Sequence, residues 1–173
     1  SLRLIPNLDV IRPSNSMELI HSYRYALEKR DNPKAIILSR QNMKFFDNDV
    51  SYKDFQTGAY EFMPGKDITL VATGSELELA VEISKNLKDL SVQIISAPIL
   101  NKINKERIES LNLNQNIFTL ELGRSTGWDS YIENITRSFS IDSFGESAPI
   151  EDLTKKYNFS AEKISDEIRS LLN

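Results

Sequence analysis

One stretch, residues 67–90 (DITLVATGSELELAVEISKNLKDL), constrains the fold more than any other part of the chain. Its first run, Ile68 to Ala72, is rich in β-branched residues and apolar on both faces. Such a run is typical of a strand buried under helices on both sides of a parallel sheet. A Thr-Gly pair at residues 73–74 ends the run, and a helical pattern follows. Strand, tight turn and helix in this order predict the first half of a βαβ unit.

The helical half of this stretch carries a predicted cap and an amphipathic pattern. Ser75 stands three residues before Glu78, which is the spacing of a capping box in which hydroxyl and carboxylate both accept from early amides. We therefore expect a helix whose first turn is closed by these two side chains. Small or apolar residues then recur at helical spacing and would face the sheet: Leu77, Ala80, Val81, Ser84 and Leu87.

Bulk composition limits the classes of function. The 173 residues are 40% hydrophobic and 27% charged, which suits one well-buried core or a domain with an appendage. The net charge of −4 argues against nucleic-acid and anionic-membrane partners, because both require a basic surface. No apolar stretch reaches the roughly 20 residues of a membrane span. Cysteine is absent, which excludes disulfides and thiolate metal sites and fits a reducing compartment.

Residues 1–42 predict a small strand–helix–strand piece. A short strand over residues 8–13 ends at a proline, and Asn15 with Glu18 then forms a second capping-box pattern. The helix is expected to continue to about Arg30. Its predicted inner face consists of Leu19, Ile20, Tyr23 and Leu27. A second strand, residues 35–38, completes the piece, which buries too little surface to be stable alone.

Residues 43–66 break the periodicity and are interpreted as a linker containing Gly58, Pro64 and Gly65. The segment has too many aromatic residues for a free tether, so we expect it to lie against its neighbours. These aromatic residues are Phe45, Phe46, Tyr52, Phe55, Tyr60 and Phe62.

Residues 67–173 alternate strands with helices. Further strands are predicted at 92–97, 116–122 and 139–144, and further helices at 103–111, 128–136, 150–157 and 161–172. This alternation indicates a three-layer α/β domain with a mostly parallel sheet of about five strands. The predicted organisation is thus 1–42, the end of another α/β domain, then the 43–66 linker and a complete domain over 67–173.

Several polar residues favour structural roles over chemistry. The turn at residues 73–76 could hold an anion at a helix N-terminus, but Glu76 and Glu78 would repel a phosphate there. His21 is the only histidine and is expected to be partly exposed on its helix, so a metal site is not predicted. Glu121 and Glu146 could be paired carboxylates, although nothing in the sequence fixes their separation.

Two further residues are candidates for other roles: Trp128 for packing and Arg40 for binding an anion. Trp128, which follows a glycine, is interpreted as a core or interface anchor rather than a substrate platform. Arg40 follows a buried strand directly, and Gln41 and Asn42 come next. Its guanidinium has the planar geometry that grips a phosphate or a carboxylate, which leaves an anion site and a structural ion pair equally open.

The chain resembles the transketolase family along nearly its whole length. The resemblance rests on five motifs that occur in the family's order and at about its spacing: residues 1–13 (SLRLIPNLDVIRP), 37–42 (ILSRQN), 58–60 (GAY) with 67–81, 127–128 (GW), and 144–149 (FGESAP). The family fold implied is the end of a pyrimidine-binding domain, a linker and the transketolase C-terminal domain.

This resemblance implies an activity for the parent enzyme. Transketolases use thiamine diphosphate and a divalent metal, Mg or Ca, to move a two-carbon ketol unit from a ketose phosphate to an aldose phosphate. The resemblance makes Arg40 the arginine that binds the substrate phosphate, and it implies a cytoplasmic homodimer. The family's G-D-G diphosphate motif is absent from these residues, so we expect a C-terminal fragment with no catalytic residue, no bound cofactor or metal, and no turnover of its own.

Two alternatives remain open. Within the same superfamily the chain could come from a deoxyxylulose-phosphate synthase or from the β subunit of a 2-oxo-acid dehydrogenase, and residues 39–42 (SRQN) argue against both. A non-catalytic α/β module that binds a ligand or a protein through residues 67–173 is the second alternative. Nucleotide binding at the turn after Ala72 would favour that module.

Overall fold

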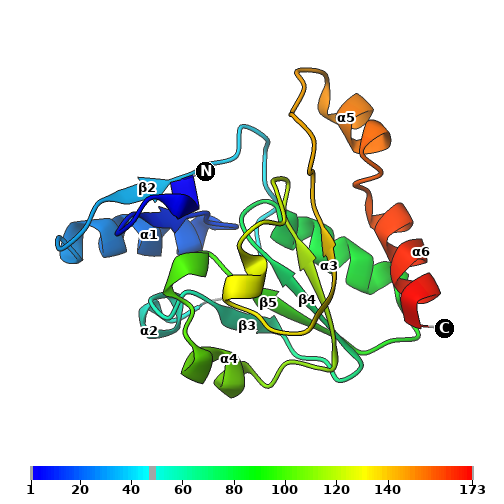
Figure 1. Ribbon diagram of the computed structural model, residues 1–173, viewed down its shortest axis with the longest axis horizontal. Coiled ribbons are helices and arrows are strands. Elements are labelled where there is room, and N and C mark those ends of the chain that lie inside the picture. Colours follow the sequence, from blue (N-terminus) through cyan, green and yellow to red (C-terminus); the bar gives the residue numbers. More distant parts are fainter. Residues whose placement is uncertain (1, 47–49, 173) are drawn as a thin grey trace.

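The computed structural model describes residues 2–46 and 50–172, and the chain folds as a small strand–helix–strand piece followed by a larger α/β domain (Figure 1). Ser1, residues 47–49 and Asn173, which fall in the predicted first piece, linker and last domain, lie outside the described residues. The strands are β1 (Asp9–Ile11), β2 (Lys34–Ile36), β3 (Tyr60–Met63), β4 (Ile68–Ala72), β5 (Val92–Ser96), β6 (Asn116–Leu120) and β7 (Ile135–Phe139). The helices are α1 (Ser16–Glu28), α2 (Tyr52–Phe55), α3 (Glu76–Asn86), α4 (Lys105–Leu111), α5 (Ile150–Lys156) and α6 (Ala161–Leu172), with short 3-10 turns η1 (Leu2–Leu4), η2 (Leu100–Lys102) and η3 (Trp128–Ser130).

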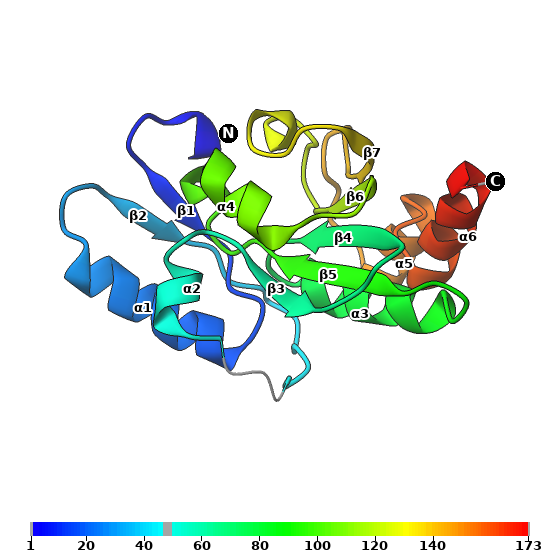
Figure 2. The same cartoon turned by 90° about the horizontal axis from the view of Figure 1, so that it is seen from below.

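The larger domain is built on a five-stranded sheet in the order β3-β5-β4-β6-β7. All neighbouring strands run parallel except β3, which pairs antiparallel with β5 at one edge. β4 and β5 are buried along their whole length, because apolar residues occupy both of their faces. Helices α3 and α6 cover one face, and α4 with the segment around Trp128 covers the other (Figure 2). The predicted mostly parallel α/β sheet is confirmed.

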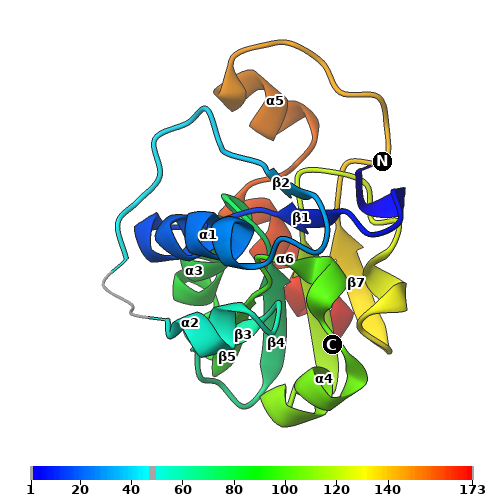
Figure 3. The same cartoon turned by 90° about the vertical axis from the view of Figure 1, so that its left-hand side faces the viewer.

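The first piece is a separate two-stranded parallel sheet of β1 and β2, with α1 beside it (Figure 3). The predicted βαβ arrangement is therefore confirmed. Two of its residues, Ile11 and Tyr25, share a small buried cluster with Phe55, Tyr60 and Ile99 of the following segments. This cluster fixes the piece against the carboxyl-terminal side of the larger sheet.

The predicted inner face of α1 is wrong. The side chains of Ile20, Tyr23 and Leu27 are 57%, 53% and 67% exposed. The opposite, more polar side is buried, with Glu18 and Ser22 fully inaccessible. The helix turns this side inward because hydroxyl and backbone groups of the larger domain accept and donate hydrogen bonds there. The apolar stripe of α1 consequently has no cover among the described residues.

Three local predictions also differ from the structure. Ser75 has helical φ and ψ and does not cap α3, because its hydroxyl donates to the Glu76 carboxylate instead. The helix predicted over 128–136 is a single 3-10 turn, and the strand predicted at 139–144 lies earlier, as β7. Asn134, with a φ of 57°, reverses the chain between them.

The span 43–66 contains α2 and β3, which were not predicted, and β3 joins the edge of the sheet. Two of its aromatic residues, Phe55 and Tyr60, are buried as expected, whereas Phe45 is 77% exposed. Among the described residues, no helix has the length and apolarity that crossing a membrane would require.

Candidate functional site

Arg40 lies in the irregular segment after β2 and is exposed. Its guanidinium has no hydrogen-bond or ion-pair partner among the described residues. The segment is shaped locally, because the Gln41 amide donates to the Ser39 hydroxyl over 3.0 Å. The structural ion pair that the sequence left open for Arg40 is therefore not formed with any residue in 2–46 or 50–172.

The segment around Arg40 also borders a cleft of about 320 Å³ at the carboxyl-terminal edge of the larger sheet. Ser39, Gln41 and Asn42 line one side, and the first turns of α3 and residues of α5 line the other. Lys44 closes the rim by pairing with Glu78 and Glu82 over 2.8 and 2.6 Å. Parallel α/β sheets bind ligands at this edge, so the cleft and Arg40 occupy the expected side of the fold.

A buried ion-pair cluster stands beneath this edge and was not predicted. Arg12, directly after β1, donates from Nη1 to Glu121 Oε1 and from Nη2 to Glu76 Oε2, each over 2.9 Å. Glu121 follows β6, and Glu76 begins α3. Arg12 therefore joins the first piece to two loops of the larger domain through charge-assisted hydrogen bonds.

The second oxygen of Glu121 completes the cluster. Glu121 Oε2 accepts from Arg3 Nη1 over 2.7 Å and from the indole Nε1 of Trp128 over 2.9 Å. Trp128 is 1% exposed, which confirms its predicted role as a buried anchor. Burial raises the pKa of the Glu76 carboxyl, and the charge of Arg12 acts in the opposite direction.

A second buried carboxylate, Glu18, joins α1 to the larger domain. Its Oε1 accepts from Tyr60 Oη over 2.8 Å and from Ser96 Oγ over 2.6 Å, while Oε2 accepts from the Ser14 amide over 2.6 Å. Asn15 accepts from the Glu18 amide over 2.9 Å, so the second predicted cap is formed. Burial raises the pKa of Glu18, and burial with the neighbouring carboxylate raises the pKa of Tyr60.

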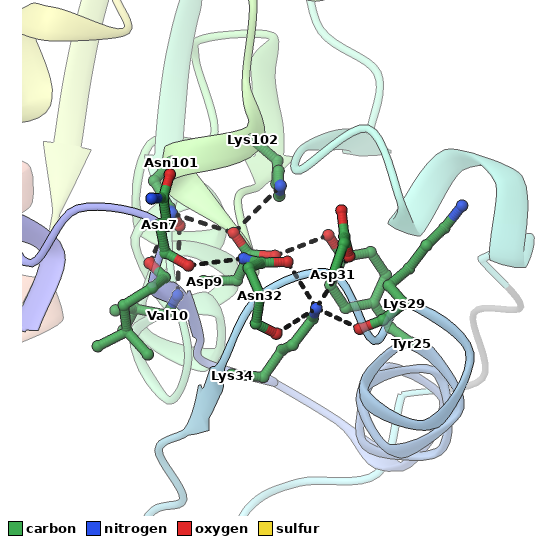
Figure 4. A network of polar contacts seen from close by, with 11 residues as sticks. Asn7, Asp9, Val10, Tyr25, Lys29, Asp31, Asn32, Lys34, Asn101 and Lys102 are labelled. Atoms are coloured by element: carbon green, nitrogen blue, oxygen red, sulfur yellow. Dashed lines mark hydrogen bonds and ion pairs between the residues drawn. The ribbon is translucent and has the colours of Figure 1, made fainter.

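A third group of polar contacts, shown in Figure 4, involves Asp9 of β1. Asp9 accepts from Tyr25 Oη over 2.9 Å and pairs with Lys102 Nζ over 3.1 Å. Asn101 donates to the Leu8 carbonyl over 2.9 Å. Residues of η2 thus bind the start of β1, and the first piece is attached to the larger domain by three separate polar groups.

The remaining predicted candidates do not assemble into a site. His21 is buried rather than partly exposed, and its Nε2 lies 2.8 Å from the Val50 carbonyl. Glu146 is exposed and pairs with Lys156, so it does not meet Glu121 as a carboxylate pair. The partner of Glu121 is Glu76, which shares Arg12 with it. Glu121 directly follows β6, whereas Glu76 begins α3 four residues after β4, so no local sequence signal joined the two.

Metal and cofactor binding find no support in the part of the chain that the structure describes. No group of three or more His, Cys, Asp or Glu side chains there could hold a metal ion. The sequence also contains no G-D-G motif. A larger cleft of about 1040 Å³ between α4 and η3 lies at the amino-terminal edge of β6, away from Arg40.

Two family profiles match this chain. The profile described as "Transketolase-like TK C-terminal domain" matches residues 58–160. The profile described as "Transketolase, pyrimidine binding domain" matches residues 1–45. Residues 46–57 lie between the two matches and belong to neither.

Curated relatives match over the same span. A Bacillus subtilis transketolase is 32% identical over 186 positions, covering 100% of this chain and 28% of its own length. A Buchnera aphidicola transketolase is 34% identical over 183 positions, covering 99% of this chain and 28% of its own length. The chain thus spans only a minor part of these relatives.

Solved structures agree with the fold. A Pichia stipitis transketolase in complex with sedoheptulose-7-phosphate superposes with a TM-score of 0.86 and 28% identity, covering 98% of this chain and 26% of that one. A Leishmania mexicana transketolase gives 0.86 and 30%, again covering 98% and 26%. A split-gene transketolase described as an inactive β4 tetramer gives 0.77 and 25%, covering 99% of this chain and 60% of that one.

Proposed function

The chain belongs to the transketolase family, and on this premise we propose that it is the carboxyl-terminal part of a ketol-transferring enzyme. The whole enzyme would use thiamine diphosphate and a divalent metal to move a two-carbon unit from a ketose phosphate to an aldose phosphate. The observation that carries this proposal is the pair of adjacent family matches over residues 1–45 and 58–160. We retain the division into 1–42, 43–66 and 67–173 as part of the proposal.

Within this enzyme, Arg40 would bind the phosphate of the sugar substrate. Support comes from its exposure, from the lack of a partner for its guanidinium within residues 2–46 and 50–172, and from its place after a parallel strand. A phosphate accepts two parallel hydrogen bonds from a guanidinium, which fixes the orientation of the sugar as well as its affinity. Such positioning of a substrate contributes to the rate by reducing the entropy lost on reaching the reactive geometry.

The experiment is a chimera in which this chain replaces the aligned part of the Bacillus subtilis transketolase. We expect the chimera to transfer a ketol unit between sugar phosphates. Arg40→Ala should lower kcat/KM for a phosphorylated donor about 10²-fold, the loss of a charge-assisted hydrogen-bond pair. For a donor without phosphate, the chimera and its Arg40→Ala variant should have the same kcat/KM.

Arg124→Ala is the matched control, because Arg124 is also exposed and only approaches Asp142 at 4.0 Å. It should leave both donors unaffected. A folded chimera without ketol transfer would contradict the proposed activity. Equal losses for both donors in Arg40→Ala would contradict the phosphate role while leaving the activity standing.

We further propose that the 173 residues alone do not turn over substrate and bind neither cofactor nor metal. Support comes from the missing G-D-G motif and from the described residues, which offer no metal-binding group. Calorimetric titration of the chain with thiamine diphosphate and Mg should give no heat of binding. We also propose that the whole enzyme is a homodimer and that it is cytoplasmic, and the absence of cysteine is compatible with a reducing compartment.

A further inference from the structure

The larger domain has the topology of a ligand-binding α/β sheet. The chain leaves β4 for β5 on one side and then crosses to β6 on the other, so the strand order reverses between β4 and β6. In open parallel sheets, ligands bind in the crevice outside the carboxyl ends of the strands at this reversal. In this domain, that crevice lies between the turn at Gly74 and the residue after β6, Glu121.

The crevice already contains a side chain from the first piece. The Arg12 guanidinium contacts the Gly74 turn so closely that a Cβ at Gly74 would lie 3.3 Å from Arg12 Cβ, Cζ and Nε. Gly74 has a φ of 65°, which few other residues adopt. Glu76 binds Arg12 from the β4 side and Glu121 binds it from the β6 side. Arg12 therefore occupies the position of a ligand.

We propose that the crevice between β4 and β6 is a guanidinium-binding site and that Arg12 is its built-in ligand. The site would accept a planar cation of the arginine or methylguanidinium class when Arg12 is removed. This inference concerns the domain's own site and does not depend on the ketol transfer proposed above.

The geometry selects a guanidinium over other cations. The two carboxylates approach from the start of α3 and from the residue after β6, and each accepts from a different Nη of one planar group. An ammonium can also bridge two carboxylates, but it donates from a single nitrogen and lacks the planar, spaced donors that this arrangement matches. Glu76 and Glu121 are 1% and 8% exposed, so the site is largely dry. Arg3 and Trp128 hold the second oxygen of Glu121, which fixes the direction of the first. With Arg12 absent, two carboxylates would face only Arg3, so an anion would be repelled.

Chemical rescue of Arg12→Ala tests the proposal. The variant should unfold at a lower temperature than the native chain, because it leaves two buried carboxylates without their shared cation. Methylguanidinium should raise the Tm of Arg12→Ala by about 4 °C at about ten times its Kd, as linkage requires. Methylammonium at the same concentration has the charge without the planar donors and should not raise it.

Arg24→Ala is the matched control, because Arg24 pairs with Glu28 on the surface, where both side chains are about half exposed. Neither it nor the native chain should gain stability from methylguanidinium. Equal effects of methylguanidinium on Arg12→Ala and Arg24→Ala, or equal effects of the two cations on Arg12→Ala, would overturn the proposal.

If Arg12→Ala does not fold, Arg12→Lys replaces it, since the ammonium keeps one charge in the crevice. The lysine variant should still be stabilised by methylguanidinium more than by methylammonium, and the double variant Arg12→Lys, Glu76→Gln should show no such preference. A preference that persists without the Glu76 carboxylate would also overturn the proposal.

Discussion

The two parts of the molecule are stabilised by opposite means. The larger domain encloses its apolar residues in two clusters on either face of a central sheet. The first piece buries polar groups against that domain and leaves the apolar stripe of α1 uncovered. Glu18, Asp9 and Arg12 each reach across from the first piece to the larger domain.

This difference separates a folding unit from an attached part. A two-stranded sheet with one helix buries too little apolar surface to be stable by itself. Its position here depends on one small apolar cluster and on several polar contacts. Polar contacts contribute little net stability each and depend strongly on geometry. An exposed apolar face of this kind marks a surface that another element covers.

The largest expected effect comes from the larger core. Phe118 is fully buried in β6 and stacks against Phe139 with ring centroids 6.2 Å apart. Phe118→Ala should lower the free energy of unfolding by about 4 kcal/mol, because the sheet cannot close the cavity that remains. Urea unfolding monitored by circular dichroism measures this. A loss of unfolding free energy below about 1 kcal/mol would contradict the tight packing of Phe118 in this core.

The next effect concerns the attachment through Glu18. Glu18→Ala should cost about 3 kcal/mol, because it leaves the Tyr60 and Ser96 hydroxyls and the Ser14 amide buried without an acceptor. Glu18→Gln should cost less, since an amide can pair with both hydroxyls and the backbone. Urea unfolding at neutral pH compares the two variants, and equal losses would contradict the hydrogen-bond account.

Glu18 also predicts a pH dependence. Burial raises its pKa above the ordinary 4.5, so the folded state holds this proton more tightly than the unfolded state. Its contribution to stability is therefore greatest below pH 4.5 and decreases as pH rises through the folded-state pKa. The stability of the native chain should fall relative to Glu18→Gln over that range. If the difference in unfolding free energy between the native chain and Glu18→Gln did not change with pH, the direction of the pKa shift would be contradicted.

A smaller effect is expected at Tyr25. Tyr25→Phe removes the hydroxyl that donates to the buried Asp9 over 2.9 Å while keeping the ring in its apolar cluster. The cost should be about 1 kcal/mol, because Lys102 still pairs with Asp9. Combining Tyr25→Phe with Lys102→Met should cost more than the sum of the single changes, as a double-mutant cycle would measure.

The smallest effect is expected on the uncovered face of α1. Ile20→Ser and Leu27→Ser should each change the stability of this chain by less than about 0.5 kcal/mol, because both side chains are more than half exposed. The same changes should destabilise the chimera with the Bacillus subtilis relative, where the face is expected to be covered. Equal effects in the two proteins would contradict the idea of a covering element.

Local periodicity was enough to predict most of the larger domain. The runs that became β4, β5 and β6 are apolar on both faces, and α6 begins and ends at the residues expected. Predictions failed where the signal was short or ambiguous. The pattern over residues 128–136 predicted a helix, whereas the structure has a 3-10 turn at Trp128–Ser130, a left-handed Asn134 and the start of β7 at Ile135.

The site was predictable only in part. Arg40 was singled out because it follows an apolar run and because its motif resembles a known family, and its role stays a prediction. The strand before it, β2, ends at Ile36 and is half-buried rather than buried. The cluster of Arg12, Glu76 and Glu121 could not be predicted, because its members lie 45 or more residues apart and meet only through the sheet topology. The buried face of α1 was predicted wrongly for a similar reason. Periodicity shows that a helix has an apolar and a polar face, but not which of them packs against the rest of this chain.

Amide hydrogen exchange tests most directly the claim that the first piece is attached rather than part of the core. The amides of α1 and β1 should exchange through an opening that requires less free energy than the opening of β4 and β6. Arg12→Ala should lower the protection of α1 and β1 further while changing that of β4 and β6 less. Equal opening free energies in all four elements, shifted equally by Arg12→Ala, would contradict the account.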